Sequence, residues 1–291
     1  MELFIQQVVT GISIGAVYSL LAVGYALVFS VYNFTNWAFD AFMVVGAFAG
    51  FYAVASFNLP FWAAVIFAIV MTVAISLLVE TGAYRPLRMH NAPRLFMMIS
   101  AMGANITLIN LINNIFGGAS HDFSQVAGGT YRIGNIAIGK LDVFAAVFSF
   151  ITLGLLWFFL QRTRAGLAIR ASALDTTTAG ILGVNNNRVA LLIFTITGIL
   201  SATAGVFYGM KYNVYPYMGG ITIKAMIASI IGGLGSLPGA VVGSLLLGVL
   251  ETLIAGYLSS SYRDLFSFLF LIIVLLFLPN GLMGLRSEDK L

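Results

Sequence analysis

The segment QRTRAGLAIRASALDTTTAGILGVNNNRV, residues 161–189, is a polar island between long apolar segments. It carries four arginines and a single acid, Asp175. Within it, residues 166–183 have the spacing of a helix that stops at Gly183. A basic segment between two membrane spans is expected on the cytoplasmic side. Its length and helical pattern suit a docking surface for a soluble partner, and a solvated loop without a partner fits the pattern equally well.

The composition of the whole chain decides the fold class. The 291 residues are 60% hydrophobic and only 8% charged, with a mean hydropathy of +1.01, whereas soluble domains are about 25% charged. Many apolar runs approach the roughly 20 residues that a membrane helix needs, and they lack the alternation of barrel strands. The sequence therefore predicts an all-α, polytopic transmembrane helical bundle, built as one domain over residues 1–291.

Nine segments are candidates for crossing the bilayer. The seventh, residues 223–231, is too short to cross unaided, and the glycine-rich run GGLGSLPG, Gly232–Gly239, follows it. This run is either a broken or re-entrant segment or a tight turn, because irregular backbone at membrane depth must be buried in protein. The bundle therefore has eight or nine spans. The nine segments are residues 3–31, 41–57, 61–80, 95–116, 143–160, 190–210, 223–231, 238–258 and 265–282.

The distribution of arginine and lysine predicts the orientation. Most of these residues lie in residues 81–94, residues 161–189 and the C-terminal tail, which are therefore placed in the cytoplasm. With nine crossings the N-terminus is external and the C-terminus cytoplasmic. The glycine-rich residues 117–142 are then an external hairpin loop. The formal net charge of +4 gathers on one side, so it indicates topology and not a nucleic-acid partner.

Several kinds of chemistry find no support in the sequence. There is no cysteine, so disulfides and thiolate metal sites are excluded. His90 and His121 fall in loops assigned to opposite sides, so no metal site is predicted. Gly232–Gly239 lacks the Lys-Ser/Thr of a phosphate-binding loop. The start Met1-Glu2 has no basic region, so no cleaved signal peptide is expected.

Polar residues inside apolar spans are the candidates for function. Asn105 and Asn113 share one helical face, which we assign to hydrogen bonds between helices more than to a wet pathway. Asp40 is expected to cap the second span. Glu80 is expected to snorkel or to pair with a loop. Glu251 lies deepest. A buried hydrogen bond to another helix, or a protonated acid, is favoured over a proton relay because no second acid is placed to receive the proton.

Five stretches, in this order, carry a resemblance that covers nearly the whole chain. They are residues 11–48, the motif AYRPLR (residues 83–88), residues 162–189, residues 232–251 and the ending YLSSSYRDLFSFLFLIIVLLFLPNGLMG (residues 257–284). The chain resembles the H-type permease subunits of bacterial ABC importers for the branched-chain amino acids leucine, isoleucine and valine.

The resemblance implies a role and a set of partners. The chain would be a non-enzymatic permease subunit in the bacterial cytoplasmic (inner) membrane. It would pair with a second, related permease and two cytoplasmic ATPase subunits, which bind ATP and Mg, and an external binding protein would deliver the substrate. The chain itself would hold no cofactor. Contacts to the ATPase would come from Arg170, Ala173, Leu174, Asp175, Thr178, Ala179, Leu182 and Gly183.

Candidates for lining or gating the path come from three places: the entry to the second span, the asparagine face and the glycine-rich run, together with the deep acid. They are Asn36, Trp37, Phe39, Asp40, Asn105, Asn113, Gly232, Gly235 and Glu251.

The chain departs from the family pattern at two places. The family usually has Asn-Phe-Ala-His-Gly where this chain has Asn36-Trp37-Ala38-Phe39-Asp40, and an acid where it has Leu174. The related importers that move urea, short amides or aromatic acids remain alternatives. A stand-alone secondary transporter would need a coupled pair of buried acids, and an intramembrane enzyme would need clustered catalytic groups.

Overall fold

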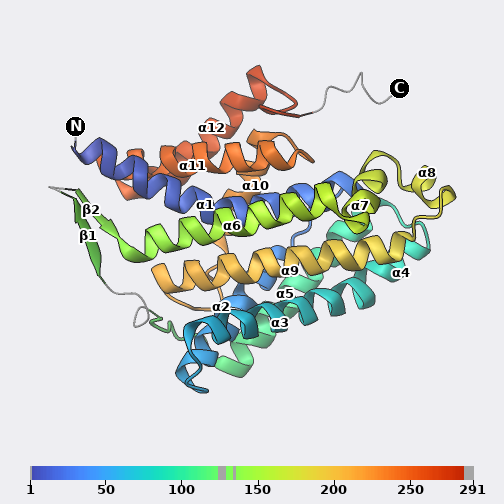
Figure 1. Ribbon diagram of the computed structural model, residues 1–291, viewed down its shortest axis with the longest axis horizontal. Helices are drawn as coiled ribbons and strands as arrows, with labels where there is room; N and C mark the ends of the chain where they lie inside the picture. Colours follow the sequence, from blue (N-terminus) through green and yellow to red (C-terminus); the bar gives the residue numbers. More distant parts are fainter. Residues whose placement is uncertain (1, 124–128, 134–135, 285–291) are drawn as a thin grey trace.

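The computed structural model describes residues 2–123, 129–133 and 136–284. The described part is a bundle of helices with one short β-hairpin at its edge (Figure 1). The first half contains α1 (Glu2–Tyr32), α2 (Phe39–Ala55), α3 (Phe61–Val79), the π-helical turn η1 (Glu80–Tyr84), α4 (Arg85–Met89) and α5 (Arg94–Phe116). The hairpin follows, with β1 (Thr130–Ile133) antiparallel to β2 (Ile136–Gly139).

The second half begins with a long helix and two short ones. It contains α6 (Lys140–Arg162), α7 (Arg164–Leu174), α8 (Thr176–Ile181), α9 (Asn186–Lys211), α10 (Gly220–Gly232), α11 (Leu237–Tyr257), the 3-10 turn η3 (Ser260–Tyr262) and α12 (Arg263–Phe277). Within the described residues, seven helical segments are long and apolar enough to cross a membrane, and α2 and α10 are shorter apolar helices. The predicted helical membrane bundle is confirmed.

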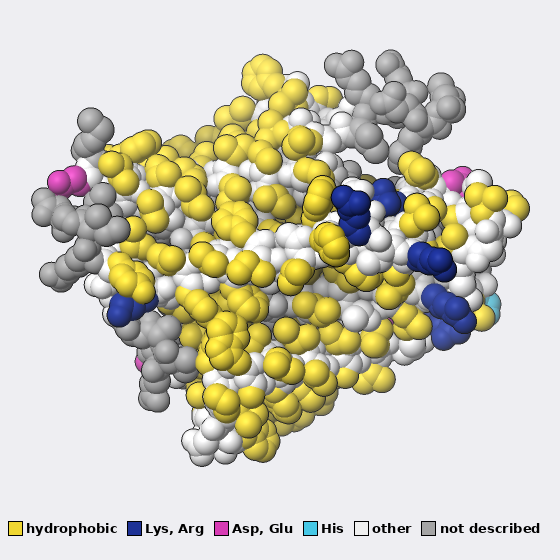
Figure 2. Space-filling model, in the orientation of Figure 1, with side chains coloured by type: hydrophobic (Ala, Val, Ile, Leu, Met, Phe, Trp, Pro, Cys, Tyr) yellow, Lys and Arg dark blue, Asp and Glu magenta, His cyan; other side chains and the backbone are white. Residues whose placement is uncertain are grey.

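The long helices run side by side, so the bundle has two distinct ends. Figure 1 shows the start of α1 and the β-hairpin at one end, and α4, α7 and α8 at the other, which we call the α7–α8 end. Apolar side chains cover the flank of the bundle, whereas most of the basic side chains in view lie at the α7–α8 end (Figure 2). This distribution suits a protein whose flank faces lipid.

Helix α1 forms the centre of the bundle. In its most apolar window 89% of the residues are buried, against 22% in α5 and in α6. Close packing with α11 depends on small residues, because a Cβ added at Gly248 would lie 2.6 Å from the Cα of Gly15. Gly11 and Gly15, four residues apart on α1, therefore serve packing within the chain, as glycines at helix crossings commonly do.

The predicted boundaries need correction at two places. Residues 166–183 are not one helix, since α7 ends at Leu174 and α8 begins at Thr176. The last helix ends at Phe277 and not at Leu282, because the following segment folds back and Leu282 N donates to the carbonyl of Ile231 (2.8 Å).

The glycine-rich run between α10 and α11 is a tight turn, which is one of the two predicted alternatives. Gly232 packs directly against Gly239, and a Cβ at Gly243 would meet the backbone of Ala228, so α10 and α11 lie antiparallel. Gly233 and Gly235 have φ of 111° and 86°, a region that glycine enters without strain.

Candidate functional site

Asp175 sets the local structure of the loop at the α7–α8 end. Its backbone is extended (φ −157°, ψ 116°) and ends α7, while its Oδ1 accepts a hydrogen bond from the N–H of Thr178 (2.8 Å) and caps α8. Hydrogen bonds from the backbone N–H groups of Thr178 and Thr177 hold the pKa of Asp175 below its usual value. Helix α8 ends at Ile181 with Leu182 as its C-cap, and Gly183 follows with a left-handed φ of 92°. The predicted role of Gly183 as a helix-stop residue is confirmed, although the helix that it ends is α8 alone.

The loop presents large apolar side chains to solvent. Leu174, Ile181 and Leu182 are 84%, 82% and 79% exposed, and we call these three residues the apolar loop surface. Ala179 points the other way and is 2% exposed, so it packs against the bundle and cannot contact a partner directly. Of the eight predicted coupling residues, Arg170, Asp175, Thr178 and Gly183 are also exposed, and Ala173 is half-buried. Ile181 was missed by the sequence analysis.

The chain doubles back before α2. Helix α1 ends at Tyr32, yet seven residues later the ring of Phe39 packs on Tyr25, with ring centroids 4.5 Å apart, and against Gly24. Gly24 lies eight residues before the end of α1, which is about 12 Å along the axis. Residues 33–38 therefore run back into the bundle in non-helical form, and α2 starts inside it.

The non-helical segment before α2 is held by buried polar contacts. Asn36 is fully buried, and its Oδ1 accepts hydrogen bonds from the N–H of Ala38 (3.0 Å) and the hydroxyl of Tyr84 (2.7 Å). These bonds replace part of the pairing that the irregular backbone lacks. Among the described residues the Nδ2 of Asn36 has no hydrogen-bond partner. Trp37 is half-buried beside this contact.

Helix α10 also starts inside the bundle, and its start meets that of α2. The chain leaves α9 at Lys211, pairs Val214 with His121 and reaches Gly219, which lies directly against the carboxylate of Asp40. The first turns of two short helices thus converge, and we call this place the half-helix junction. Broken helices that meet inside a membrane bundle are a common feature of transporter binding sites.

Asp40 occupies the half-helix junction but does not cap α2. The cap position is Ala38, which makes no side-chain cap bond, so the predicted capping role is wrong. Instead Asn105 Nδ2 donates to Asp40 Oδ2 (3.3 Å), and Asn105 Oδ1 accepts from the N–H of Ala41 (3.0 Å). The other carboxylate oxygen, Oδ1, is buried without a hydrogen-bond partner in the described part of the chain. The prediction that Asn105 bonds to another helix is confirmed.

The remaining candidates of the predicted path lie elsewhere. Asn113 is on the same face of α5 two turns beyond Asn105, near Gly118. Gly232 and Gly235 belong to the turn between α10 and α11, and Gly235 faces Ser30 at the end of α1. The structure therefore brings together five of the predicted path residues and separates them from Asn113, Gly232, Gly235 and Glu251. The five are Asn36, Trp37, Phe39, Asp40 and Asn105.

Glu251 is the centre of a fully paired network that we call the Glu251 network. Its carboxylate accepts hydrogen bonds from Tyr18 Oη (2.9 Å) and Ser267 Oγ (2.8 Å), and it pairs with Lys224 Nζ at 3.1 Å. Lys224 also reaches Asp264 at 2.8 Å. The predicted hydrogen bond to another helix is confirmed. The partner Lys224 was missed, although a lone cation in an apolar segment is itself a signal of buried pairing.

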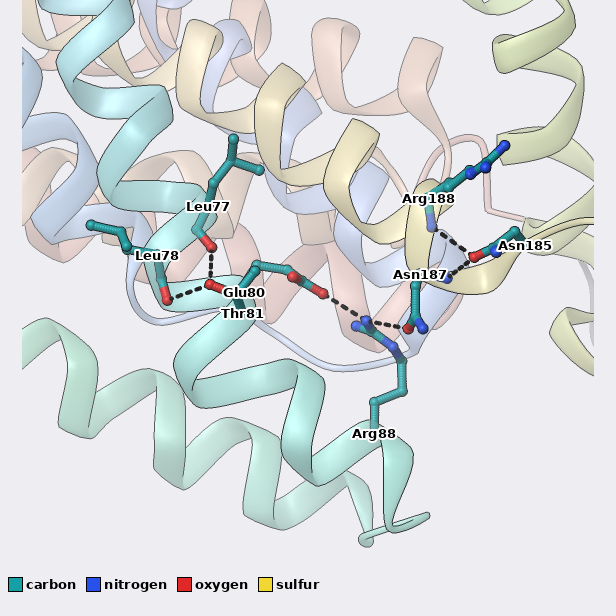
Figure 3. Close-up of polar contacts among 8 residues, drawn as sticks. All are labelled: Leu77, Leu78, Glu80, Thr81, Arg88, Asn185, Asn187 and Arg188. Carbon is teal, nitrogen blue, oxygen red and sulfur yellow. Dashed lines mark hydrogen bonds and ion pairs between the residues drawn. The ribbon is translucent and has the colours of Figure 1, made fainter.

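Glu80 pairs with Arg88, which lies in the segment predicted as a loop (residues 81–94), and does not snorkel. It is fully buried, and Arg88 from α4 donates to it at 2.6 Å (Figure 3). The same nitrogen of Arg88 donates to Asn187 Oδ1 at 3.1 Å, at the start of α9. The guanidinium also lies over the ring of Tyr32, 5.4 Å from its centre. This cluster joins α1, η1, α4 and α9 at the α7–α8 end.

A central helix wrapped by long apolar helices, with two half-length helices that meet inside, defines a polytopic membrane protein. The same fold occurs in the solved structure of PsaBC from Streptococcus pneumoniae in complex with a Fab, at a TM-score of 0.53 and 16% identity. That match covers 94% of this chain and 91% of the other.

Sequence comparison places the chain more narrowly. Residues 7–275 match the family described as branched-chain amino acid transport system / permease component, and the chain belongs to this family. It is 34% identical to the high-affinity branched-chain amino acid transport system permease protein LivH of Salmonella typhimurium, over 99% of this chain and 97% of the relative. It is 35% identical to the permease protein BraD of Pseudomonas aeruginosa, over 99% and 98%.

Proposed function

We propose that this chain is the permease subunit of an ATP-driven importer that moves branched-chain or other hydrophobic amino acids across the cytoplasmic membrane. Family membership and near full-length similarity to LivH and BraD support the transport class. The observation that carries the mechanism is the apolar loop surface, in which three large side chains are about 80% exposed beside a capped helix. An exposed apolar patch of this kind is typical of a docking site.

The partner at this surface is a cytoplasmic ATPase subunit. Arginines gather at the α7–α8 end, and basic residues favour the cytoplasmic side (Figure 2). This orientation leaves the start of α1 and the β-hairpin outside, where a binding protein delivers the substrate. The complete importer contains a second permease and two ATPase subunits. ATP and Mg bind to the ATPase subunits, and this chain holds no cofactor and performs no catalysis.

The substrate path passes the half-helix junction. Asp40 is only partly buried, one of its oxygens has no partner in the described part of the chain, and two helix starts converge on it. The ends of short helices move more easily than the middle of a long one, because fewer backbone bonds hold them. When the ATPase subunits close, the displacement of α7 and α8 is transmitted through α9 and α1, which contact α7 directly.

Uptake in proteoliposomes tests the proposed function. The purified complete importer is reconstituted with ATP inside and leucine-loaded binding protein outside, and entry of radiolabelled leucine is measured. We expect uptake to stop when a non-hydrolysable ATP analogue replaces ATP. We also expect unlabelled isoleucine or valine to compete with the radiolabelled leucine. Uptake that is equal without hydrolysis would indicate a stand-alone transporter, and competition by urea but not by valine would reassign the substrate.

A further inference from the structure

A polar cavity of about 510 Å³ lies at the α7–α8 end and has no role in the function proposed above. Its walls come from the end of α1, the turn between α4 and α5, the end of α7, the start of α8 and the start of α9. A second hollow of about 200 Å³ shares several of these walls and adds Leu174 and Asp175. The cavity therefore connects the membrane bundle with the apolar loop surface.

The cavity is cationic. The charged side chains that line it are Arg88 and Arg94, and the described lining residues include no acid. Arg88 is neutralised by Glu80 at 2.6 Å. Arg94 has no ion pair within the described ranges, and it lines both the cavity and the neighbouring hollow, where Asp175 is already bonded to Thr178. A guanidinium in this position is suited to bind a carboxylate.

Two further polar groups in the wall lack partners. Ser172 is 2% exposed, and its hydroxyl has no hydrogen-bond partner among the described residues. Asn186 Oδ1 is also buried without a partner in that part of the chain. The orientation of this amide is fixed, because its Nδ2 donates to the carbonyl of Thr176 (3.2 Å). The wall thus offers one free hydroxyl donor and one free acceptor, and buried polar groups normally have partners.

The remaining wall is apolar. Val31, Met97 and Val189 line the cavity and are themselves almost fully buried. A ligand with a carboxylate for Arg94 and Ser172, an ammonium for Asn186 Oδ1 and an apolar side chain would match all three parts. A simple inorganic anion would leave the acceptor and the apolar wall without contacts.

We propose that this cavity binds a free α-amino acid with an apolar side chain from the cytoplasm, and that this binding slows the importer. The inference rests on the proposed function for the chemistry of the ligand and for the side of the membrane. The bound amino acid bridges α5 and α1 to α7 and α8, and so restrains the loop that the ATPase moves. The product of transport then inhibits further transport.

The test measures binding and inhibition in the complete importer. Radiolabelled leucine is equilibrated with the complex in nanodiscs without the binding protein, for wild type, Arg94→Gln and the control Arg188→Gln. Arg188 is exposed, lies outside the cavity lining and points away from Arg88 (Figure 3). We expect about tenfold weaker binding in Arg94→Gln, as loss of a charged hydrogen bond implies, and unchanged binding in Arg188→Gln.

The second measurement uses proteoliposomes, in which leucine sealed inside stands on the cytoplasmic face. Internal leucine should lower the initial rate of uptake in wild type and in Arg188→Gln, and have little effect in Arg94→Gln, whose uptake without internal leucine is normal. Normal uptake with neither binding nor inhibition would overturn this inference and leave the proposed function intact. Absent uptake in wild type would overturn the proposed function instead.

Two analogues of leucine test the chemistry of the cavity. 4-Methylpentanoate lacks the ammonium, and 3-methylbutylamine lacks the carboxylate. We expect both to compete poorly with radiolabelled leucine. Full competition by 4-methylpentanoate would show a simple anion site and contradict an amino-acid site. Equal binding of leucine by wild type and Arg94→Gln would place the bound leucine elsewhere and also overturn the inference.

Discussion

The Glu251 network and the α7–α8 loop differ in where their side chains find contacts. In the network Glu251 is bonded inside the bundle to Tyr18, Ser267 and Lys224. In the loop the one acid, Asp175, only caps a short helix, and the apolar loop surface faces solvent. The network satisfies its charged groups inside the chain, whereas the loop leaves large apolar side chains exposed. We therefore expect the first region to control stability, and the proposed coupling role rests on the second.

The largest expected effect is the loss of the cation in the Glu251 network. Lys224→Met leaves Glu251 buried without its ion pair, and removal of one partner of a buried pair typically costs about 3 kcal/mol or more. We expect a large drop in the thermal unfolding temperature of the purified importer. The double variant Lys224→Met, Glu251→Gln removes both charges and should recover most of the loss. Unchanged stability in the single variant would show that the network is not structural.

Substitutions at the half-helix junction should lower the stability less than the loss of Lys224. A Cβ at Gly219 would overlap the carboxylate of Asp40, so Gly219→Ala should cost about 1–3 kcal/mol through overpacking. Adding Asp40→Gly removes the obstacle and should restore stability, which a double-mutant cycle on the unfolding temperature measures. Gly220→Ala is the matched control, because a Cβ there meets open space. Equal effects of the two alanine variants would contradict the described contact.

The helical membrane bundle was the part of the fold that the sequence could predict, because long apolar runs report it directly. Glycines four residues apart, such as Gly11 and Gly15, also carry a local signal of close helix approach, and they do meet α11. The return of residues 33–38 into the bundle could not be predicted, because it depends on Phe39 fitting against Gly24 of another helix. Periodicity reports which face of a helix is apolar, but it does not report which distant residues that face will meet.

The candidate site was predicted only in part, because it too depends on contacts between residues far apart in the sequence. The Asp40–Asn105 bond joins residues on two helices, and its partner Gly219 lies far along the chain. By contrast, the break at Asp175 had a local signal, since aspartate is one of the preferred residues at the N-cap of a helix. The exposure of Ile181 and the burial of Ala179 depend on how α8 lies on the bundle, which no local pattern reports.

The smallest expected effect is that of pH on the loop. The backbone N–H groups of Thr178 and Thr177 lower the pKa of Asp175 below its usual value of 3.8. A lowered pKa means that the cap contributes stability above the usual value and loses it only as pH falls through the lowered value. Asp175 therefore stays ionised between about pH 5 and 8. Wild type and Asp175→Asn should show parallel pH profiles of ATP hydrolysis, and a divergence within this range would contradict the assignment.

The most direct test of the account is the retention of the ATPase subunit by a permease with a charged loop surface. Leu174→Arg is compared with wild type and with Leu167→Arg, which places the same charge at an exposed site earlier in α7. Tagged permease is purified from cells that express all subunits, and the bound ATPase is quantified. We predict that Leu174→Arg loses the ATPase while inserting and folding normally, and that Leu167→Arg keeps it. Full retention by Leu174→Arg would contradict a coupling role for this surface.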